Sequence, residues 1–356
     1  MNGGGDKKVL LAMSGGVDSS VAAHLLLRQG YQVTGVFLCM AGAVGFDHDT
    51  SGCCSPQDAA DARRVATALG IELFVLDAGA DFTRIIDYFV DEYARGRTPN
   101  PCVQCNTLIK FARLIRRADD LGCRYVATGH YARLLEHQGG PAIHRSARKD
   151  QSYALFGLPR KHLGRILLPV GEVADKDEIR RLAAQVDPAV AAKPDSQEIC
   201  FVTDDYADLL RQRRPEAFRP GNIVDAAGTV LGRHDGVGHF TIGQRRGVRV
   251  ARGVPMYVIA IDPATASVTI GPKEAVMATR LTAAGANWHC PTPPAGKTFP
   301  ATVQIRYNHA GEAAQVTVLE GGRFAVEFDQ PVAAITPGQG AVIYEGDRLL
   351  GGGWIE

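Results

Sequence analysis

The sequence predicts an α/β fold: a doubly wound parallel-sheet domain, then a small, mainly helical linking domain, then a C-terminal β-barrel domain. Short apolar runs alternate with helical stretches from residue 9 to residue 128, as expected of βαβ units. The pattern is short and helical from about residue 158, and from about residue 220 it changes to short alternating strands separated by glycine. We therefore expect domains over residues 1–160, 161–219 and 220–356.

The predicted parallel sheet has four strands in the first 130 residues, at 9–13, 33–38, 73–76 and 125–128, and three helices, at 21–28, 57–69 and 82–94. Ligands of such sheets bind beyond the carboxyl ends of the strands. We expect the segments that begin at Ser14, Cys39 and Gly129 to meet in one crevice.

The linking domain contains a helical stretch at 178–184, for which Asp175 or Asp177 is a plausible N-cap. Predicted barrel strands lie at 256–261, 268–270 and 301–307, and a hairpin joins 314–319 to 323–328 around Gly321 and Gly322.

The composition is that of a soluble globular protein. The chain has 356 residues, of which 46% are hydrophobic, and no apolar run approaches the length of a membrane span. The first residues lack the order of a signal peptide, so we expect a cytoplasmic protein with no membrane partner. Because the net charge is only +1, nucleic-acid binding would depend on local basic runs such as 211–214 and 245–249, which are more often solvated faces.

The most informative motif is the run Ser14, Gly15, Gly16, Val17, Asp18, Ser19 and Ser20, between a predicted strand and a predicted helix. A helix N-terminus presents N–H groups and a positive dipole end to phosphate. The lysine of a Walker loop is missing, and Asp18, a candidate Mg²⁺ ligand, stands inside the motif. This arrangement suits ATP, with transfer of AMP and loss of pyrophosphate. The motif resembles that of the PP-loop ATP pyrophosphatases; the alternative is an ordinary glycine turn.

The cysteines suggest thiol or metal chemistry more than disulfides, because this is a long chain with eight of them. Cys102 and Cys105 form a CxxC whose loop is restricted by Pro99 and Pro101. Half of a zinc site fits this spacing as well, although no second CxxC completes it. Cys200 follows a polar stretch, and taken alone it is interpreted as a small buried hydrophobic residue.

Several further motifs follow in order along the chain: 98–101, 128–133, 149–153, 195–201, 241–247 and 304–307. Together with the Ser14 motif they resemble the bacterial tRNA-specific 2-thiouridylase family over nearly the whole chain. The resemblance implies 2-thiolation of the wobble uridine of tRNA. The uracil C2 oxygen is adenylated, sulfur comes from a cysteine persulfide, and AMP and pyrophosphate are released.

The resemblance also implies roles for individual residues. The nucleophilic cysteine is Cys105, the persulfide-bearing cysteine is Cys200, and Asp18 takes part in catalysis. ATP contacts fall on Ala12, Met13, Ser14, Gly15, Gly16, Val17, Asp18, Ser19, Met40 and Gly129, and tRNA contacts fall on Asn100, Pro101, Cys102, His130, Lys149, Asp150, Gln151, Arg306, Tyr307 and Gln339. Packing at strand ends is the alternative for His130 and Tyr307. The implied cofactors are ATP and Mg²⁺, and the implied partners are tRNA and a cysteine desulfurase-derived sulfur donor or a sulfur-relay protein.

One departure from the family pattern is Cys102, which stands where an aspartate is expected. Cys102, Cys105 and Cys200 would supply the three thiolates of a 4Fe–4S cluster with one open iron, which is an alternative mechanism of sulfur transfer. We interpret Cys53 and Cys54 as loop thiols on a segment, 42–56, that is long enough to act as a lid. Cys39, Cys123 and Cys290 are expected to be packing residues.

Two rival functions fit parts of the sequence. A PP-loop amidotransferase or ligase would use the Ser14 motif but leave Cys105 and Cys200 without a role. A non-catalytic RNA-binding protein with a zinc-stapled core would use the cysteines but not the intact phosphate loop. In a thiouridylase the target base must turn outward into the cleft, with Lys149, Arg306, Arg245 and Arg246 neutralising the phosphates around it.

Overall fold

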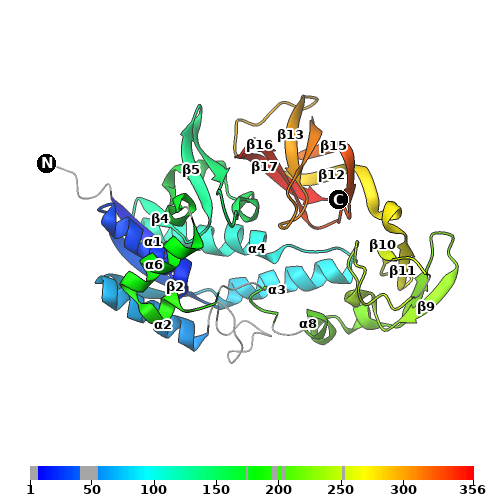
Figure 1. Ribbon diagram of the computed structural model, residues 1–356, viewed down its shortest axis with the longest axis horizontal. Helices are drawn as coiled ribbons and strands as arrows, with labels where there is room; N and C mark the ends of the chain where they lie inside the picture. Colours follow the sequence, from blue (N-terminus) through cyan, green and yellow to red (C-terminus); the bar gives the residue numbers. More distant parts are fainter. Residues whose placement is uncertain (1–6, 41–54, 174, 195–198, 203–205, 251–252) are drawn as a thin grey trace.

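The computed structural model describes residues 7–356 except 41–54, 174, 195–198, 203–205 and 251–252. Its N-terminal domain is built on a five-stranded parallel sheet in the order β3-β2-β1-β4-β7 (Figure 1). The strands are β1 Lys8–Ala12, β2 Gln32–Cys39, β3 Glu72–Asp77, β4 Tyr125–Ala127 and β7 Ile166–Leu167. The predicted parallel sheet is confirmed, and β7 is a strand that the sequence pattern did not indicate.

Helices cover both faces of this sheet because alternate β1 residues point to opposite sides. Val9 and Leu11 belong to the core shared with α1 and α6, whereas Leu10 belongs to the core shared with α5. The helices of the domain are α1 Val17–Arg28, α2 Pro56–Leu69, α3 Gly79–Ala94, α4 Pro101–Gln104, the π-helical η1 Cys105–Phe111, α5 Ala112–Asp120, α6 Lys176–Val186, α7 Pro188–Ala191 and α8 Tyr206–Arg213. None of the helices in the described ranges is long and apolar enough to cross a membrane.

The segment predicted as a linking domain contributes to the parallel-sheet domain. β7 pairs with β4, and α6 packs against α1. Asp175 is the N-cap of α6, because its side chain accepts from the Glu178 backbone N–H at 2.7 Å. The boundaries at residues 160 and 219 stay predictions.

Residues after 220 form two sheets, and this differs from the single β-barrel domain predicted there. The first is a four-stranded sheet of β8 Gly221–Val224, β9 Val230–His234, β10 Tyr257–Asp262 and β11 Ser267–Gly271, which has its own core around Val258 and Val268. Alternation predicts strands but does not show which strands pair, so the sequence could not separate the two sheets.

The second sheet is a closed barrel of six strands: β12 Met277–Trp288, β13 Thr298–Gln304, β14 Glu312–Leu319, β15 Arg323–Ala333, β16 Gly340–Glu345 and β17 Arg348–Ile355. Pairing of β12 with β17 closes it. The predicted hairpin between β14 and β15 is confirmed, and Gly321 and Gly322 both have positive φ, at 67° and 70°.

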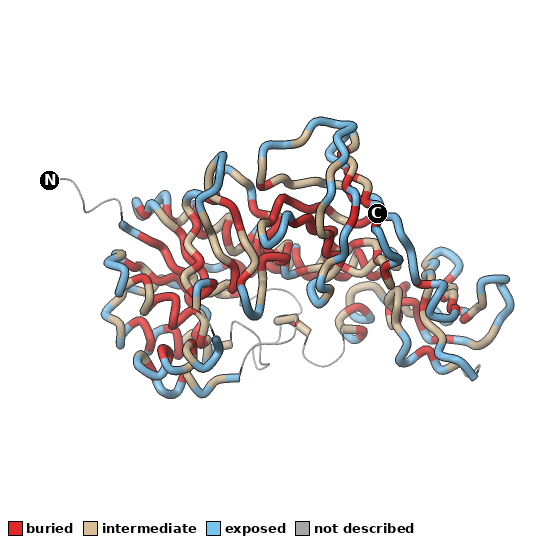
Figure 2. The backbone as a smooth tube through the Cα atoms, turned by 45° about the horizontal axis from the view of Figure 1, so that its top comes forward, coloured by how far each residue is buried: buried red, intermediate tan, exposed pale blue. Residues whose placement is uncertain are grey.

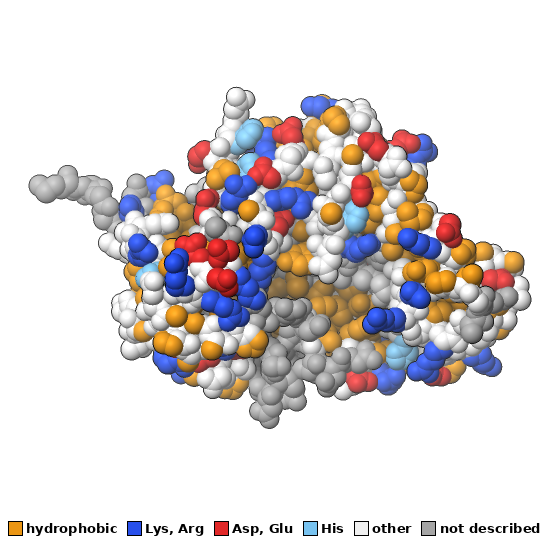
Figure 3. Space-filling view, in the orientation of Figure 1, with side chains coloured by type: hydrophobic (Ala, Val, Ile, Leu, Met, Phe, Trp, Pro, Cys, Tyr) orange, Lys and Arg blue, Asp and Glu red, His pale blue; other side chains and the backbone are white. Residues whose placement is uncertain are grey.

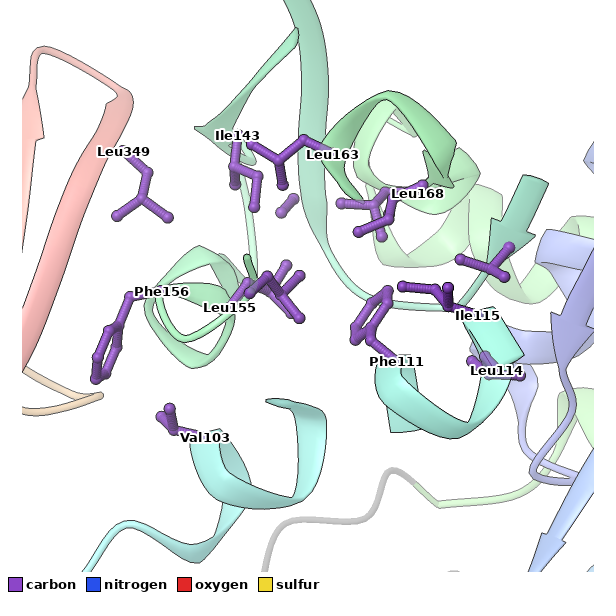
Figure 4. Packing of buried hydrophobic residues seen from close by; sticks show 14 of the residues in the cluster. Val103, Phe111, Leu114, Ile115, Ile143, Leu155, Phe156, Leu163, Leu168 and Leu349 are labelled. Atoms are coloured by element: carbon purple, nitrogen blue, oxygen red, sulfur yellow. The ribbon is translucent and has the colours of Figure 1, made fainter. Parts of the chain in front are cut away.

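The N-terminal domain and the barrel are joined by a strand pair and a common core. The hairpin β5 Ala132–His137 and β6 Gly140–Arg145 extends the barrel sheet through β17, where His144 pairs with Arg348. Figure 4 shows the shared core, in which Leu349 lies near Phe156. Buried residues run without interruption from the parallel sheet into the barrel (Figure 2).

Short 3₁₀ segments connect these elements: η2 Ser152–Leu155, η3 Arg160–Arg165, η4 Pro169–Glu172, η5 Pro215–Phe218, η6 Val237–His239 and η7 Lys273–Val276. Tyr153 in η2 is fully buried, and its hydroxyl donates to the Gly340 carbonyl and accepts from the Gly340 N–H, both at 3.1 Å. His289 is also buried at the junction, with Nε2 3.0 Å from the Phe156 carbonyl oxygen.

His289 should make stability depend on pH. Burial lowers the pKa of His289 to about 4, although hydrogen bonds to the Phe156 and Leu158 carbonyls oppose the shift. The unfolded chain takes up this proton near pH 6.5 and the folded chain only near pH 4. The free energy of unfolding therefore falls as the pH drops from 6.5 to 4, by about 3 kcal/mol from this group.

The measurement is urea unfolding at several pH values for the wild type and for His289→Gln, which cannot gain the proton. The variant should lose less stability than the wild type between pH 6.5 and pH 4. Equal pH dependence of the two proteins would contradict the prediction.

Candidate functional site

The site is built on the turn between β1 and α1. Gly16 is the N-cap of α1, and Gly15 has φ of +72°, in the left-handed region. A Cβ atom on Gly15 would lie 2.2 Å from the Asp58 carbonyl oxygen of α2. Glycine is therefore required here both by conformation and by space.

Serine hydroxyls fix the shape of this turn. The Ser19 hydroxyl donates to the Gly16 carbonyl at 3.1 Å and accepts from the Ser14 N–H at 3.2 Å. The Ser20 hydroxyl donates to the same carbonyl at 2.9 Å. The first N–H groups of α1 have no acceptor within the helix, so the turn offers an anion a rigid set of donors.

Gly129 brings the end of β4 to the same place. A Cβ atom on Gly129 would lie 2.8 to 3.0 Å from backbone atoms of Asp18 and Ser19. Met40, just after β2, is buried in an apolar cluster with Ala78 and Cys105. The carboxyl ends of β1, β2 and β4 thus converge as predicted, and Ala12, Met13 and Val17 lie within or beside the turn.

Asp18 is the acidic group of the turn. The Tyr131 hydroxyl donates to one of its carboxylate oxygens, and the Lys149 ammonium lies 3.3 Å from the other. The same ammonium lies 4.6 Å from the centroid of the Tyr131 ring. Carboxylate oxygen is the donor that Mg²⁺ prefers, and the Asp18 side chain is 30% exposed. Asp18 therefore fits the predicted metal role if Lys149 gives up its contact.

Cys105 begins η1 and is 7% exposed, within a cluster that includes Met40, Phe82 and Phe201. Cys200 packs against this same cluster. π-Helical turns occur frequently at functional sites. Two cysteines far apart in the sequence are thus brought to one apolar region, which includes Met40 at the carboxyl end of β2, the strand next to β1.

Cys102 lies in α4, and its side chain is exposed. Asn100 caps α4 by accepting from the Val103 N–H at 3.3 Å. Within the described ranges, no group of three or more His, Cys, Asp or Glu side chains is arranged to hold a metal ion. The cluster role of Cys102, Cys105 and Cys200 stays a prediction. Cys53, Cys54 and most of the 42–56 segment lie outside the described residues.

The barrel holds the loop that precedes Cys102. The Gln339 amide donates to the carbonyls of Thr98 at 3.1 Å and Pro99 at 3.0 Å, and the Thr98 N–H donates to Pro337 at 2.9 Å. Both amide hydrogens of Gln339 are used in these bonds. Its predicted tRNA contact stays a prediction, and the structure gives it a positioning role.

The segment Lys149 to Gln151 lies beside the loop between β13 and β14. Asp150 accepts from the Ser146 and Ser152 backbone N–H groups, and Gln151 accepts from the Tyr131 N–H at 2.9 Å. Tyr307 is 44% exposed. Partial burial of its hydroxyl raises its pKa, Asp150 raises the pKa further, and Lys149 lowers it, so both side chains lie near Tyr307.

Arg306 and His130 complete the predicted RNA contacts. Arg306 donates to the Ala333 carbonyl at 3.0 Å. His130 Nδ1 lies 2.7 Å from the Thr128 hydroxyl, and its ring lies against Phe111. Burial, and then Lys110, lower the pKa of His130 to about 3, so the imidazole is neutral near pH 7.

Lys and Arg side chains border a hollow between the parallel-sheet domain and the barrel (Figure 3). In the basic run 245–249, Arg245 and Arg246 are exposed. Arg213 and Arg214 instead pair with Asp87 and Asp91 of α3, so that run attaches α8 to α3.

Comparisons with known proteins agree with this geometry. A family model described as a tRNA methyl transferase HUP domain matches residues 7–204, a PRC-barrel domain of the same description matches 207–272, and an aminomethyltransferase beta-barrel domain matches 278–355. The chain is 46% identical to a tRNA-specific 2-thiouridylase of Rhodopirellula baltica (98% of this chain, 96% of that one). It is 47% identical to one of Carboxydothermus hydrogenoformans (99% and 98%) and 45% identical to one of Geobacter metallireducens (98% and 97%). The chain belongs to the tRNA-specific 2-thiouridylase family.

Family membership decides among the three functions that the sequence left open. The relatives are named as enzymes that thiolate tRNA, which fits neither an amidotransferase nor a non-catalytic RNA-binding protein.

Sequence reasoning missed a cluster of charged residues beside the β1–α1 turn at residues 14–19, the phosphate turn. Asp58 and Asp61 of α2 pair with Lys193, and Arg64 pairs with Asp61 and Asp187. These residues are distant in sequence and belong to ordinary amphipathic segments, so no motif marked them. The one available signal was Lys193, which stands two residues before the 195–201 motif.

Replacing Gly15 by Ala should remove ATP binding. An L-residue at φ of +72° costs about 1 to 2 kcal/mol, and the clash with Asp58 adds to this cost. We expect the dissociation constant for Mg·ATP, measured by isothermal titration calorimetry, to rise at least tenfold. The control is Gly70→Ala, which has φ of +66° but open space around its Cβ position. Unchanged ATP affinity in Gly15→Ala would refute the assignment of the turn.

Proposed function

We propose that this protein catalyses ATP-dependent 2-thiolation of the wobble uridine in tRNA, with release of AMP and pyrophosphate. The observation that carries the proposal is that Cys105 and Cys200 pack on one apolar cluster together with Met40, which follows β2, the strand beside the one that leads into the glycine and serine turn. Family membership supplies the reaction class, because the relatives are named for it.

ATP provides the activation. Its phosphates would accept hydrogen bonds from the turn at residues 14–19, with Met40 and Gly129 bordering the nucleotide. Asp18 would hold Mg²⁺, which when bound offsets phosphate charge. The uracil C2 oxygen attacks the α-phosphorus, the bond to the β-phosphate oxygen breaks, and pyrophosphate leaves. The C2 oxygen is then part of an AMP leaving group rather than a poorly leaving oxide.

The cysteines deliver the sulfur in two steps. In the first, Cys200 carries a persulfide whose terminal sulfur attacks C2, and AMP leaves with the original oxygen. In the second, the Cys105 thiolate attacks Sγ of Cys200, and the S–S bond breaks with its electron pair passing to the transferred sulfur. The products are 2-thiouridine and a Cys105–Cys200 disulfide, which a thiol reductant must reopen.

This route needs two thiols rather than a metal cluster. The 4Fe–4S mechanism through Cys102, Cys105 and Cys200 stays the alternative. Sulfur would come from a cysteine desulfurase, directly or through a relay protein, in the cytoplasm.

The tRNA would present its wobble base turned out of the anticodon loop. Asn100, Pro101 and Cys102 would border the base. His130 is neutral and suited to hydrogen bonding rather than to charge neutralisation. Lys149, Asp150, Gln151, Arg306, Tyr307 and Gln339 would contact the surrounding RNA, directly or by holding the segments that do.

Substitution of either cysteine should abolish thiolation while leaving tRNA bound. Cys105→Ser and Cys200→Ser should each lower 2-thiouridine formation at least about a hundredfold, because serine neither carries nor attacks a persulfide under these conditions. Nucleoside mass spectrometry after incubation with ATP, Mg²⁺ and a persulfide source gives the readout, with Cys290→Ser in the barrel as control. Retained activity in Cys200→Ser would exclude the persulfide role. Iron and acid-labile sulfide that are required for activity would support the cluster instead.

Binding of tRNA should depend on salt more than binding of ATP. If Lys149, Arg245, Arg246 and Arg306 each meet a phosphate, the slope of log affinity against log salt should be about −3 to −4. Filter binding at several salt concentrations tests this, and Lys149→Gln should reduce the slope by about 1. Lys297→Gln, at an exposed barrel turn, should leave the slope unchanged. A flat salt dependence would show that these cations do not form the RNA contact.

A further inference from the structure

A buried ion cluster lies against the phosphate turn on the side of α2. The Lys193 ammonium donates to Asp58 at 2.9 Å, to Asp61 at 2.5 Å and to the Gly15 backbone carbonyl at 3.2 Å. An ammonium has three N–H donors, so these three acceptors use all of them. Lys193 thus joins α2 to the peptide between Gly15 and Gly16.

The cluster is built to hold this lysine in one place. The side chains of Asp61, Asp58 and Lys193 are 5%, 18% and 26% exposed. Interaction with Asp61 and Asp58 raises the pKa of Lys193, although burial opposes the shift, so its charge is retained.

Contacts around the cluster fix its two sides. Arg64 binds both Asp61 and Asp187, and Asp187 caps α7, the helix that leads to Lys193. Arg180 donates to the Lys193 carbonyl at 3.3 Å. The position of the ammonium is therefore set both from α2 and from its own segment.

The peptide that Lys193 binds lies at a conformationally permissive position. It is flanked by two glycines, and glycine occupies positive and negative φ with similar ease. In a planar trans peptide the carbonyl and the following N–H point in opposite directions. Holding the Gly15 oxygen toward α2 therefore aims the Gly16 N–H away from α2, whereas the flipped peptide would present an oxygen to a phosphate.

We propose that Lys193 is a positioning residue for ATP, which locks the Gly15–Gly16 peptide so that the Gly16 N–H faces the bound phosphates. The inference rests on the proposed function in taking ATP as the ligand of this turn. It differs from simple charge compensation, in which Lys193 would only neutralise Asp58 and Asp61 beside an anionic ligand. The two roles predict different results when the charge is balanced by another substitution.

The test measures KM for ATP and for tRNA, and the dissociation constant for Mg·ATP, in Lys193→Met and in Lys193→Met/Asp61→Asn. The double variant has the same net charge as the wild type, and it removes the buried carboxylate that would destabilise the single variant. We expect KM and the dissociation constant for ATP to rise at least tenfold in both variants, with KM for tRNA unchanged. Arg214→Met, which breaks an ion pair with Asp91 of α3 and contacts neither the cluster nor Gly15, should change the ATP values less than twofold.

Full recovery of ATP affinity in the double variant would overturn the peptide lock, as would unchanged affinity in Lys193→Met or an equal loss in Arg214→Met. Wild-type behaviour separates this inference from the proposed function. If the wild type binds ATP but does not thiolate tRNA, the proposed function fails while the test of Lys193 stands. If the wild type does not bind ATP, both fail.

Discussion

The site depends on the close packing of the β1–α1 turn between α2 and the end of β4. The positions of two glycines prove how close it is: a Cβ atom on Gly15 would reach the Asp58 carbonyl oxygen at 2.2 Å, and one on Gly129 would reach Asp18 at 2.8 Å. This packing limits the movement of the turn when a ligand binds, and the bond from Lys193 to the Gly15 carbonyl restricts its peptide further. Its N–H groups are therefore arranged before the phosphates arrive, and little ordering entropy is lost on binding.

The barrel takes part in the site as well as extending the fold. Its Pro337 to Gln339 loop holds the backbone of Thr98 and Pro99, and these residues lead directly to α4 and Cys105. The Tyr153 hydroxyl, buried between the domains, bonds both backbone groups of Gly340. Because buried polar groups are costly to leave unpaired, these bonds fix the barrel in one orientation. The loop that leads into the helical CxxC is thus positioned by a domain remote from it in sequence.

The sequence was sufficient for four of the five strands of the parallel sheet, the glycine-rich turn after β1 and the convergence of three strand ends, because each follows from local pattern and from a general property of such sheets. It also narrowed the N-cap of α6 to Asp175 or Asp177, since capping is local, and the structure shows Asp175. It could not predict the separate four-stranded sheet, because strand pairing is nonlocal. The same reason hid Lys193 and Asp61, which are 132 residues apart and meet only in three dimensions. The sequence pattern predicts local geometry, but it does not predict which residues distant in sequence come into contact.

The ion pair between Asp18 and Lys149 ties the ATP side of the site to the RNA side. Asp18 belongs to the phosphate turn, and Lys149 begins the segment beside Tyr307 that is predicted to contact tRNA. One of the Asp18 oxygens already accepts from Tyr131 and the other faces the ammonium, so a Mg²⁺ ion that takes a carboxylate oxygen weakens the hold on Lys149. If Asp18 holds Mg²⁺ and Lys149 meets a tRNA phosphate, as proposed, the two substrates are linked through a single side chain. Thermodynamic reciprocity then requires that tRNA phosphate drawing Lys149 away also favours Mg²⁺ at Asp18.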